Sequence, residues 1–220
     1  MKRLLITGFE PFAGLKENPS ADLASEIASS GVEGFAVRAA LLPVSFGRSF
    51  EVMFNEIEKF SPHYVLSLGL GRGREKLCLE RIAINHIDAT IADNDGAQPR
   101  GVAIRRRGRD GIFSEMPLAM MAESARALGV PAEVSNSAGT FVCNFLMYRT
   151  LEISRKLGFY SGFLHVPLTP SLAKPGEASM DSWKALSGLR AMIGAMALPS
   201  DFPTVESFDA QVETSNRLPI

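Results

Sequence analysis

The chain has 220 residues, which is enough to bury a sizeable core in a single domain. Hydrophobic residues make up 46% of it and charged residues 21%, an ordinary globular composition that excludes a disordered or fibrous protein. The 23 Lys and Arg residues nearly balance the 24 Asp and Glu residues. The chain therefore lacks the excess positive charge that is typical of proteins that bind nucleic acid or an anionic membrane, and we expect neither as a partner.

The amino-terminal apolar run stops at Ile6, before Thr7 and Gly8. It is too short for the core of a signal peptide and is typical of a first buried strand. No apolar stretch approaches the length of a membrane span. The two cysteines, Cys78 and Cys143, are expected to be free thiols in a reducing compartment. The sequence therefore indicates a cytoplasmic protein.

Short apolar runs alternate with stretches of helical periodicity along the chain. In chain order, the expected elements are a strand at 3–7, a helix beginning at Pro19 with Asn18 as its cap, a strand at about 35–42, a helix at about 46–57, a strand at 63–69, a helix at 118–128, a strand at 132–135, a helix at 140–157, a strand at 160–166 and a helix at about 183–196. This alternation favours an α/β fold with a mainly parallel sheet that is covered on both sides.

Residues 76–110 interrupt this alternation and are expected to form a strand pair with a long loop. No internal repeat or linker divides the rest of the chain. We expect residues 1–198 to form one domain. Residues 199–220 are rich in Pro, Ser and acidic residues, and we expect a tail that is either loose or packed on a partner subunit.

Cys143 closes the run SNSAGTFVC, in which small residues precede the helix predicted at 140–157. The thiol is therefore expected in or near the first helical turn. There, unpaired backbone N–H groups and the positive end of the helix dipole favour the reactive thiolate. The alternative is a small buried side chain without chemistry, as free cysteines often are.

His165 comes near the end of the strand predicted at 160–166, in the run GFLHVP. The carboxyl ends of parallel strands form the edge at which α/β sheets place ligands. The alternative is a core histidine whose ring is satisfied by a backbone group. The other two histidines are weaker candidates, since His63 is expected to be solvated and His86 half-buried.

Glu80 opens the run ERIAIN, and in an extended segment it shares a face with Ile82 and Ile84. A carboxylate on an apolar face needs a partner, and a histidine is a suitable one. The alternative is an ion pair with Arg81 or Arg74.

Together the three side chains make a stronger hypothesis than any of them alone. A thiol nucleophile needs a base that takes its proton and returns it to the leaving amine. That base needs a third group to fix its tautomer. We expect Cys143, His165 and Glu80 to fill these roles and to project from one edge of the sheet.

Two other motifs are expected to have structural roles only. The run GLGRGR at 69–74 follows a strand, but Arg74 stands at the third glycine position of a dinucleotide-binding motif and no helical stripe follows. The basic cluster at 105–109 lacks interleaved aromatic residues and is expected to be a solvated loop.

Several of these segments together resemble the pyroglutamyl peptidase I family, also called pyrrolidone carboxyl peptidases. The matching runs are TGFEPFAG at 7–14, NPS at 18–20, ERIAIN at 80–85, DNDG at 93–96, the segment 135–144 and GFLHVP at 162–167. They stand in the family's order and spacing. The resemblance implies an α/β/α sandwich, no cofactor or metal, a cytoplasmic homotetramer and N-terminally pyroglutamylated peptides as substrates. It also implies Glu80, Cys143 and His165 as the catalytic triad.

The resemblance further implies a substrate pocket with apolar walls, lined by Phe9, Phe12, Ile91, Phe141 and Val142. Pyroglutamate is a flat, neutral lactam with one N–H, one ring carbonyl and no α-ammonium group. A selective pocket therefore needs apolar walls and a few hydrogen bonds rather than a charged clamp. The alternatives are core packing for Phe141 and Val142, and a hydrophobic lid or a subunit contact for Phe9 and Phe12.

Two positions depart from the family pattern. Leu70 stands where many members carry Gln, and Thr90 stands where they carry Arg. The expected activity is hydrolysis of the amide bond after an N-terminal pyroglutamyl residue, and these departures leave two alternatives. One is a related hydrolase of another small cyclic or acyl amide. The other is a binding protein that retains the pocket without turnover.

Overall fold

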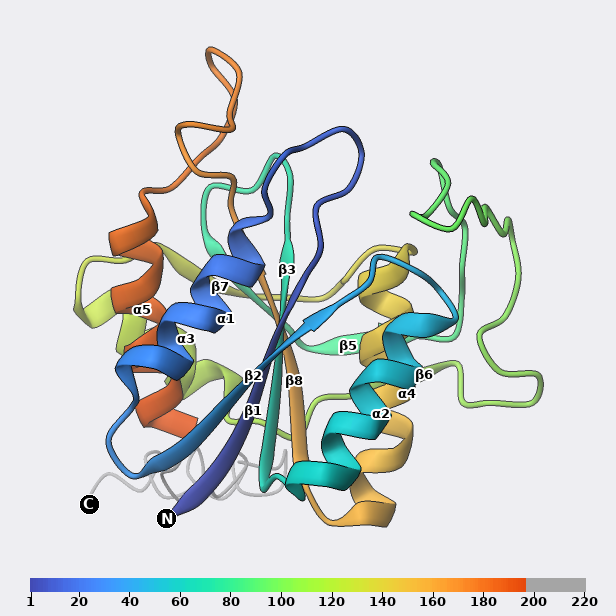
Figure 1. Cartoon of the computed structure of the whole chain (residues 1–220), viewed down its shortest axis with the longest axis horizontal. Coiled ribbons are helices and arrows are strands. Elements are labelled where there is room, and N and C mark those ends of the chain that lie inside the picture. Colours follow the sequence, from blue (N-terminus) through green and yellow to red (C-terminus); the bar gives the residue numbers. More distant parts are fainter. Residues whose placement is uncertain (197–220) are drawn as a thin grey trace, which may run out of the picture.

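The computed structural model describes residues 1–196, and Figure 1 shows them arranged around one central sheet. Six strands form this sheet in the order β2-β1-β3-β8-β4-β7. They are β1 (Lys2–Phe9), β2 (Phe35–Leu42), β3 (Tyr64–Leu70), β4 (Leu77–Glu80), β7 (Ala132–Ser135) and β8 (Tyr160–Val166). The first three strands and β8 run parallel, so the sheet is mainly parallel as the sequence predicts.

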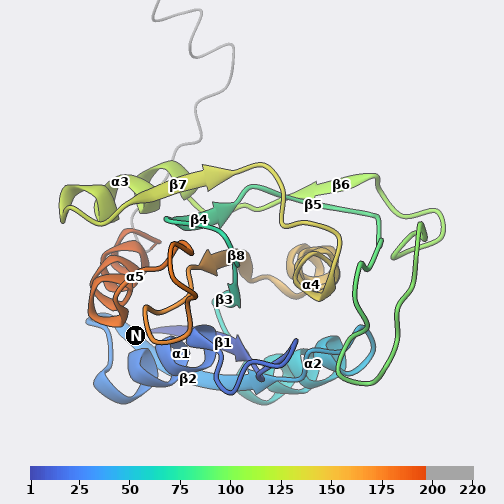
Figure 2. The same cartoon turned by 90° about the horizontal axis from the view of Figure 1, so that it is seen from above.

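Helices cover both faces of the sheet, as Figure 2 shows. On one face lie α1 (Pro19–Ser30), α3 (Leu118–Ala127) and α5 (Ser182–Met196). On the other lie α2 (Arg48–Phe60) and α4 (Val142–Leu157). The buried apolar side chains therefore form two cores, one on each side of the strands. The expected three-layer α/β/α sandwich is confirmed.

The start of α1 shows how the sequence fixes the loops above the sheet. Asn18 is the N-cap, and its side-chain oxygen accepts a hydrogen bond from the backbone N–H of Ser20 (3.2 Å). Pro19 occupies the first turn, where its missing N–H costs nothing. The Ser20 hydroxyl oxygen accepts a hydrogen bond from the backbone N–H of Phe9 (3.0 Å). This last bond ties the helix start to the end of β1.

Residues 77–80 lie elsewhere than the sequence suggests. β4 is a member of the central sheet, antiparallel to β8 and parallel to β7. The expected strand pair is instead formed by β5 (Ile82–Ile84) and β6 (Gly111–Phe113), with the long loop between them. All four residues of β4 are buried, so the short run LCLE has no alternation that would reveal its place.

The boundary predicted after residue 198 and the tail predicted at 199–220 lie outside the described residues. Within residues 1–196, no helix is long and apolar enough to cross a membrane.

Gly69 in β3 leaves room for two side chains that pack over the sheet. A Cβ atom at this position would lie 2.8 Å from the ring of Phe163 and 3.0 Å from the Cys143 sulfur. We therefore expect Gly69→Ala to lower the free energy of unfolding by about 1–3 kcal/mol, the usual cost of overpacking a core.

Gly194 in α5 provides the matched control, because a Cβ atom there would have nothing within 4 Å. Gly194→Ala should raise the free energy of unfolding by about 0.5–1 kcal/mol, since alanine is the better helix former. Urea denaturation of both variants measures the difference. Equal effects of the two substitutions would contradict the close packing around Gly69.

Candidate active site

The first turn of α4 carries the candidate nucleophile. Gly139 has a φ of +77°, a left-handed conformation that side chains rarely adopt, in the loop between β7 and the helix. Phe141 is the N-cap, with extended backbone and no side-chain hydrogen bond to the first turn. Cys143 is the second residue of α4, where the sequence predicts it. The backbone N–H groups of this turn therefore have no side-chain cap.

Asn144, the next residue, fixes this turn to the segment of β5. Its side chain is fully buried. Its Oδ1 accepts a hydrogen bond from the backbone N–H of Ile84 (2.9 Å), and its Nδ2 donates to the carbonyl oxygens of Ile84 (2.9 Å) and His86 (3.0 Å). No sequence feature assigned this role to Asn144, because partners in another segment cannot be read from a helical pattern.

The Cys143 sulfur lies over Gly69 of β3, which pairs with β8. The sulfur would be 3.0 Å from a Cβ atom at Gly69, and Gly69 is the register partner of His165. Phe163 belongs to the core beneath α4, and side chains two residues apart on a strand share a face. Cys143 and His165 therefore lie on the same face of the sheet, at adjoining positions.

His165 and Glu80 form a buried polar contact. The distance from His165 Nδ1 to Glu80 Oε1 is 2.7 Å, and the Glu80 side chain is fully buried. Glu80 is the register partner of Phe163 on the antiparallel strand β4, so it reaches His165 diagonally across the strand pair. An ionised carboxylate only accepts hydrogen bonds, so Nδ1 carries the proton and Nε2 is left to accept one.

This geometry changes one expectation from the sequence. The three candidates do meet on one face of the sheet, but Glu80 does not come from the same strand edge as His165. It comes from a strand that runs in the opposite direction.

Arg74 is a second partner of the same carboxylate. Its Nη2 lies 3.1 Å from Glu80 Oε1 and donates a hydrogen bond to the carbonyl oxygen of Ser137 (3.0 Å). The sequence left His165 and Arg74 as alternative partners of Glu80, and the structure has both. The other carboxylate oxygen, Oε2, is buried without a hydrogen-bond partner among the described residues.

Burial raises the pKa of the Cys143 thiol to about 12, and the charge of Glu80 acts in the same direction. The backbone at the helix start and the charge of Arg74 oppose this increase without cancelling it. The helix start favours the thiolate as expected, but desolvation of the sulfur outweighs it, so the neutral thiol is the more stable form. A neutral thiol becomes a nucleophile only when a base takes its proton.

Three aromatic rings meet beside the start of α4. Phe12 stacks on Phe141 with ring centroids 6.3 Å apart, and Phe46 meets Phe141 edge to face at 5.3 Å. Phe12 and Phe141 are partly exposed, whereas Phe46 is buried behind them. The structure therefore brings together two of the predicted pocket residues and adds Phe46 as their support.

The other predicted pocket residues are placed differently. Phe9 and Val142 are core residues, 2% and 1% exposed. The Phe9 ring contacts Phe163, with centroids 6.4 Å apart, and Phe163 in turn contacts the His165 ring at 5.0 Å. Ile91 is 43% exposed in the long loop between β5 and β6.

The structure also places the two residues that depart from the family pattern, Leu70 and Thr90. Leu70 ends β3 and is buried, and Thr90 is exposed in the long loop. Arg100 lies beside Thr90. Its Nη1 donates a hydrogen bond to the carbonyl oxygen of Ala89 (2.7 Å), and its Nε lies 3.3 Å from Oδ1 of Asp88. A cation therefore stands next to position 90, although another part of the loop supplies it.

The DNDG run at 93–96 is a turn that fixes Phe46. The Asp93 side chain is buried. Its Oδ2 accepts a hydrogen bond from the backbone N–H of Phe46 (2.9 Å), and its Oδ1 accepts from the N–H groups of Asp95 (3.0 Å) and Ala97 (2.8 Å). One carboxylate thus joins the turn to the loop between β2 and α2.

Asn94 extends the same connection to the loop after β1. Its backbone N–H donates to the carbonyl oxygen of Val44 (2.9 Å), and its side-chain Nδ2 donates to that of Pro11 (3.0 Å). The turn therefore holds the segments that carry Phe12 and Phe46 in one arrangement.

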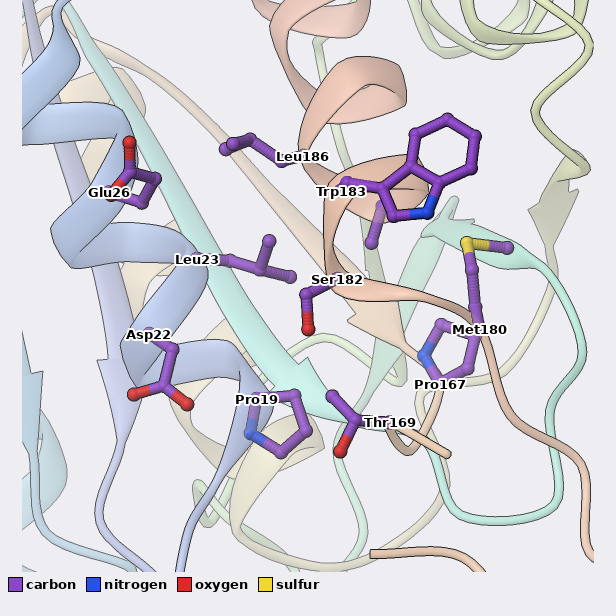
Figure 3. Close-up of a pocket in the computed structure, with 11 residues that line it drawn as sticks. Pro19, Asp22, Leu23, Glu26, Pro167, Thr169, Met180, Ser182, Trp183 and Leu186 are labelled. Carbon is purple, nitrogen blue, oxygen red and sulfur yellow. The ribbon is translucent and has the colours of Figure 1, made fainter. Parts of the chain in front are cut away.

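A separate cavity of about 250 Å³ lies between α1 and α5 (Figure 3). Its lining includes Leu23, Trp183 and Leu186, together with the acidic side chains of Asp22 and Glu26. It belongs to the face opposite to α4, so we do not assign the candidate chemistry to it. Within residues 1–196, no cluster of three or more His, Cys, Asp or Glu side chains is arranged to hold a metal ion.

Removing the Asp93 carboxylate should loosen the loops around Phe46. Three backbone N–H groups lose their acceptor, so we expect Asp93→Ala to lower the free energy of unfolding by about 2–4 kcal/mol. Asp95→Ala is the control, because Asp95 pairs with Arg48 at the surface and should contribute little. Chemical denaturation measures both variants. Equal stability of the two would show that Asp93 does not organise the turn.

Comparison with known proteins identifies the family. The family model described as pyroglutamyl peptidase matches residues 2–198. The pyrrolidone-carboxylate peptidase of Escherichia fergusonii is 43% identical over 82% of this chain and 86% of its own, and pyrrolidone-carboxylate peptidase 1 of Streptococcus pneumoniae is 40% identical over 88% and 92%.

Two solved structures resemble the whole described fold. Pyroglutamyl peptidase I from Bacillus amyloliquefaciens matches with a TM-score of 0.88 and 30% identity, over 92% of this chain and 99% of its own. Pyrrolidone carboxyl peptidase from the hyperthermophile Pyrococcus furiosus matches with a TM-score of 0.85 and 34% identity, over 88% and 97%. The chain belongs to the pyroglutamyl peptidase family.

Proposed function

We propose that this chain is a cysteine peptidase that hydrolyses the amide bond after an N-terminal pyroglutamyl residue, using Cys143, His165 and Glu80. The observation that carries the proposal is the buried 2.7 Å contact between His165 and Glu80, on the face of the sheet where the Cys143 sulfur lies. Membership of the pyroglutamyl peptidase family supports the substrate class.

The reaction starts from the neutral thiol. His165 Nε2 takes the proton of Cys143 while the sulfur forms a bond to the pyroglutamyl carbonyl carbon. Negative charge develops on the carbonyl oxygen, which the uncapped N–H groups of the first turn of α4 stabilise. Glu80 accepts the hydrogen bond of Nδ1 and stabilises the imidazolium that forms.

The second half of the reaction uses the same proton carrier. The tetrahedral species collapses, the C–N bond breaks, and His165 donates its proton to the departing amine. Pyroglutamate remains as a thioester on Cys143. His165 then takes a proton from water as the water oxygen attacks the thioester, and the proton returns to the sulfur as pyroglutamate leaves.

The pyroglutamyl ring is proposed to bind in a pocket formed by Phe9, Phe12, Ile91, Phe141 and Val142, in which Phe12, Ile91 and Phe141 are the accessible side chains and Phe9 and Val142 belong to the core. The stacked rings of Phe12 and Phe141 support this, because both side chains are partly exposed to solvent. Phe141 is also the N-cap residue of α4, two residues before Cys143. Flat apolar faces suit a neutral lactam. They disfavour an α-ammonium group, which would lose its hydration there.

Substrate selectivity tests the proposal. We expect a pyroglutamyl amide to be cleaved with a far higher kcat/KM than prolyl or glutaminyl amides. The prolyl ring lacks the carbonyl that pairs with a donor in the site, and both of these substrates bring an ammonium group. Equal rates on all three amides, or a preference for an amine-bearing one, would reject pyroglutamyl specificity.

In the same assay, Phe12→Ala should lower kcat/KM on the pyroglutamyl amide by the equivalent of about 1–3 kcal/mol, the range for one apolar wall contact. Cys143→Ala serves as the inactive reference.

Alkylation tests the nucleophile. Cys78 is 1% exposed and Cys143 is partly exposed, so iodoacetamide should modify Cys143 first and abolish activity in step. Because the pKa of Cys143 is raised to about 12, its thiolate fraction grows with pH throughout the neutral range. The alkylation rate should therefore rise about tenfold per pH unit without a plateau.

The alkylation rate of Cys143 is measured by peptide mass mapping, and the residual activity is assayed in the same samples. Cys78→Ser should leave the alkylation rate of Cys143 unchanged. Full activity after complete labelling of Cys143 would exclude it as the nucleophile. A plateau near neutral pH would show that the thiolate forms before substrate binds.

The family resemblance also leads us to propose a cytoplasmic homotetramer. Sedimentation of the purified chain measures the assembly, and fractionation of the source cells measures the compartment.

A further inference from the structure

Arg74 stands where three parts of the site meet. One nitrogen, Nη2, contacts both the Glu80 carboxylate (3.1 Å) and the Ser137 carbonyl oxygen (3.0 Å). Ser137 lies in the loop between β7 and α4, so this guanidinium joins the carboxylate to the segment that precedes Cys143. The Arg74 side chain is 28% exposed, whereas that of Glu80 is 0% exposed. The pair is therefore a partly buried one, unlike the ion pairs of the molecular surface.

The backbone before Arg74 makes room for this contact. A Cβ atom at Gly71 would lie 2.8 Å from Cδ of Arg74 and 3.0 Å from Cβ of His165. Any larger residue at position 71 would push the arginine stem or the imidazole out of place. The turn that follows β3 therefore leaves space at Gly71 for the side chains of both Arg74 and His165.

The charges explain what Arg74 contributes. Glu80 is a fully buried carboxylate, and a buried charge without a cation is strongly destabilising. The Arg74 guanidinium, which stays protonated in proteins, lies 3.1 Å from Glu80 Oε1 and supplies the compensating charge. The charge of Glu80 raises the pKa of Cys143 and that of Arg74 lowers it, so Arg74 also limits the cost of placing a carboxylate beside the thiol.

We propose that Arg74 is a positioning residue for the reaction, which holds the Glu80 carboxylate against His165 and ties it to the loop that leads into α4. This inference rests on the proposed function of the site. Arg74 acts through Glu80 and His165 and does not contact the reacting atoms. Its loss should therefore change kcat while substrate binding is retained.

The test compares Arg74→Ala with Arg72→Ala in the full chain. Arg72 lies on the same turn and pairs with Glu177 (2.6 Å), so its removal deletes an equal charge without touching Glu80. We expect Arg74→Ala to lower kcat on a pyroglutamyl amide about tenfold to a hundredfold with KM nearly unchanged, as for loss of one hydrogen bond to a charged group. Arg72→Ala should retain both constants.

Chemical rescue separates positioning from a merely structural role. Millimolar guanidinium chloride, compared with equal sodium chloride, supplies the missing cation to the space left by Arg74→Ala and should restore part of kcat. It should have no such effect on Arg72→Ala. Wild-type kcat in Arg74→Ala, or a loss that guanidinium leaves unchanged, would overturn the proposal.

Two further variants keep the test decisive if Arg74→Ala does not fold. Arg74→Lys keeps the charge and Arg74→Gln removes it, so the lysine variant should have the higher kcat. Equal kcat values would overturn the role of the charge.

If the wild-type chain does not cleave the pyroglutamyl amide, the proposed function fails, and Arg74 is then tested without substrate. Arg74→Ala should speed the exchange of the His165 Nδ1 proton, followed by ¹⁵N NMR, because Arg74 holds the carboxylate that accepts this proton. An unchanged exchange rate would overturn the proposal independently of the activity.

Discussion

The buried hydrogen bond between His165 and Glu80 is the constraint on which the rest of the site depends. It joins neighbouring antiparallel strands inside the sheet, so turning the imidazole would take away the buried hydrogen-bond partner of Glu80 and leave the carboxylate with Arg74. Losing a buried hydrogen bond to a charged group typically costs about 1.5–3 kcal/mol. The bond therefore fixes the ring orientation and the tautomer together, and Nε2 is the nitrogen left for chemistry. The glycines at positions 69 and 71 leave the space beside it, since a Cβ atom would crowd the Cys143 sulfur at position 69 and both Arg74 and His165 at position 71.

A raised pKa of the thiol is compatible with this arrangement. A thiol whose pKa is raised by desolvation and by the charge of Glu80 is most stable in its neutral form, and a base on the adjoining strand can take its proton as the bond to substrate forms. The charge then created on the imidazole meets Glu80, whose own charge Arg74 already compensates in the resting protein. Each ionised group thus has a partner in both states, so the reaction exposes no unpaired buried charge. This removes the need for a preformed thiolate at the helix start.

Local patterns made much of the fold predictable. The helices have apolar stripes, and the start of α1 has both a capping asparagine and a proline in its first turn. β4 was not predictable as a strand of the central sheet. Its four buried residues show neither the alternation of a half-buried strand nor the periodicity of a helix, and its place depends on strands far along the chain. Cys143 and His165 were placed by their positions at a helix start and a strand end. The roles of Asn144 and Asp93 were not predictable, since each depends on partners from other segments, and Arg74 was predictable only as an alternative partner of Glu80. The raised pKa of the Cys143 thiol was not predictable, because the sequence shows the helix start but not the desolvation of the sulfur.

The tautomer of His165 tests the central constraint most directly. The chain has three histidines, so ¹⁵N NMR of protein labelled at the imidazole nitrogens, with His165→Asn for assignment, resolves each ring. We expect neutral His165 to carry its proton on Nδ1 and to exchange that proton slowly, because it is held by Glu80 inside the sheet. In Glu80→Gln the exchange should become fast. A neutral His165 with its proton on Nε2, or exchange that is the same in Glu80→Gln, would contradict the role of the His165–Glu80 bond.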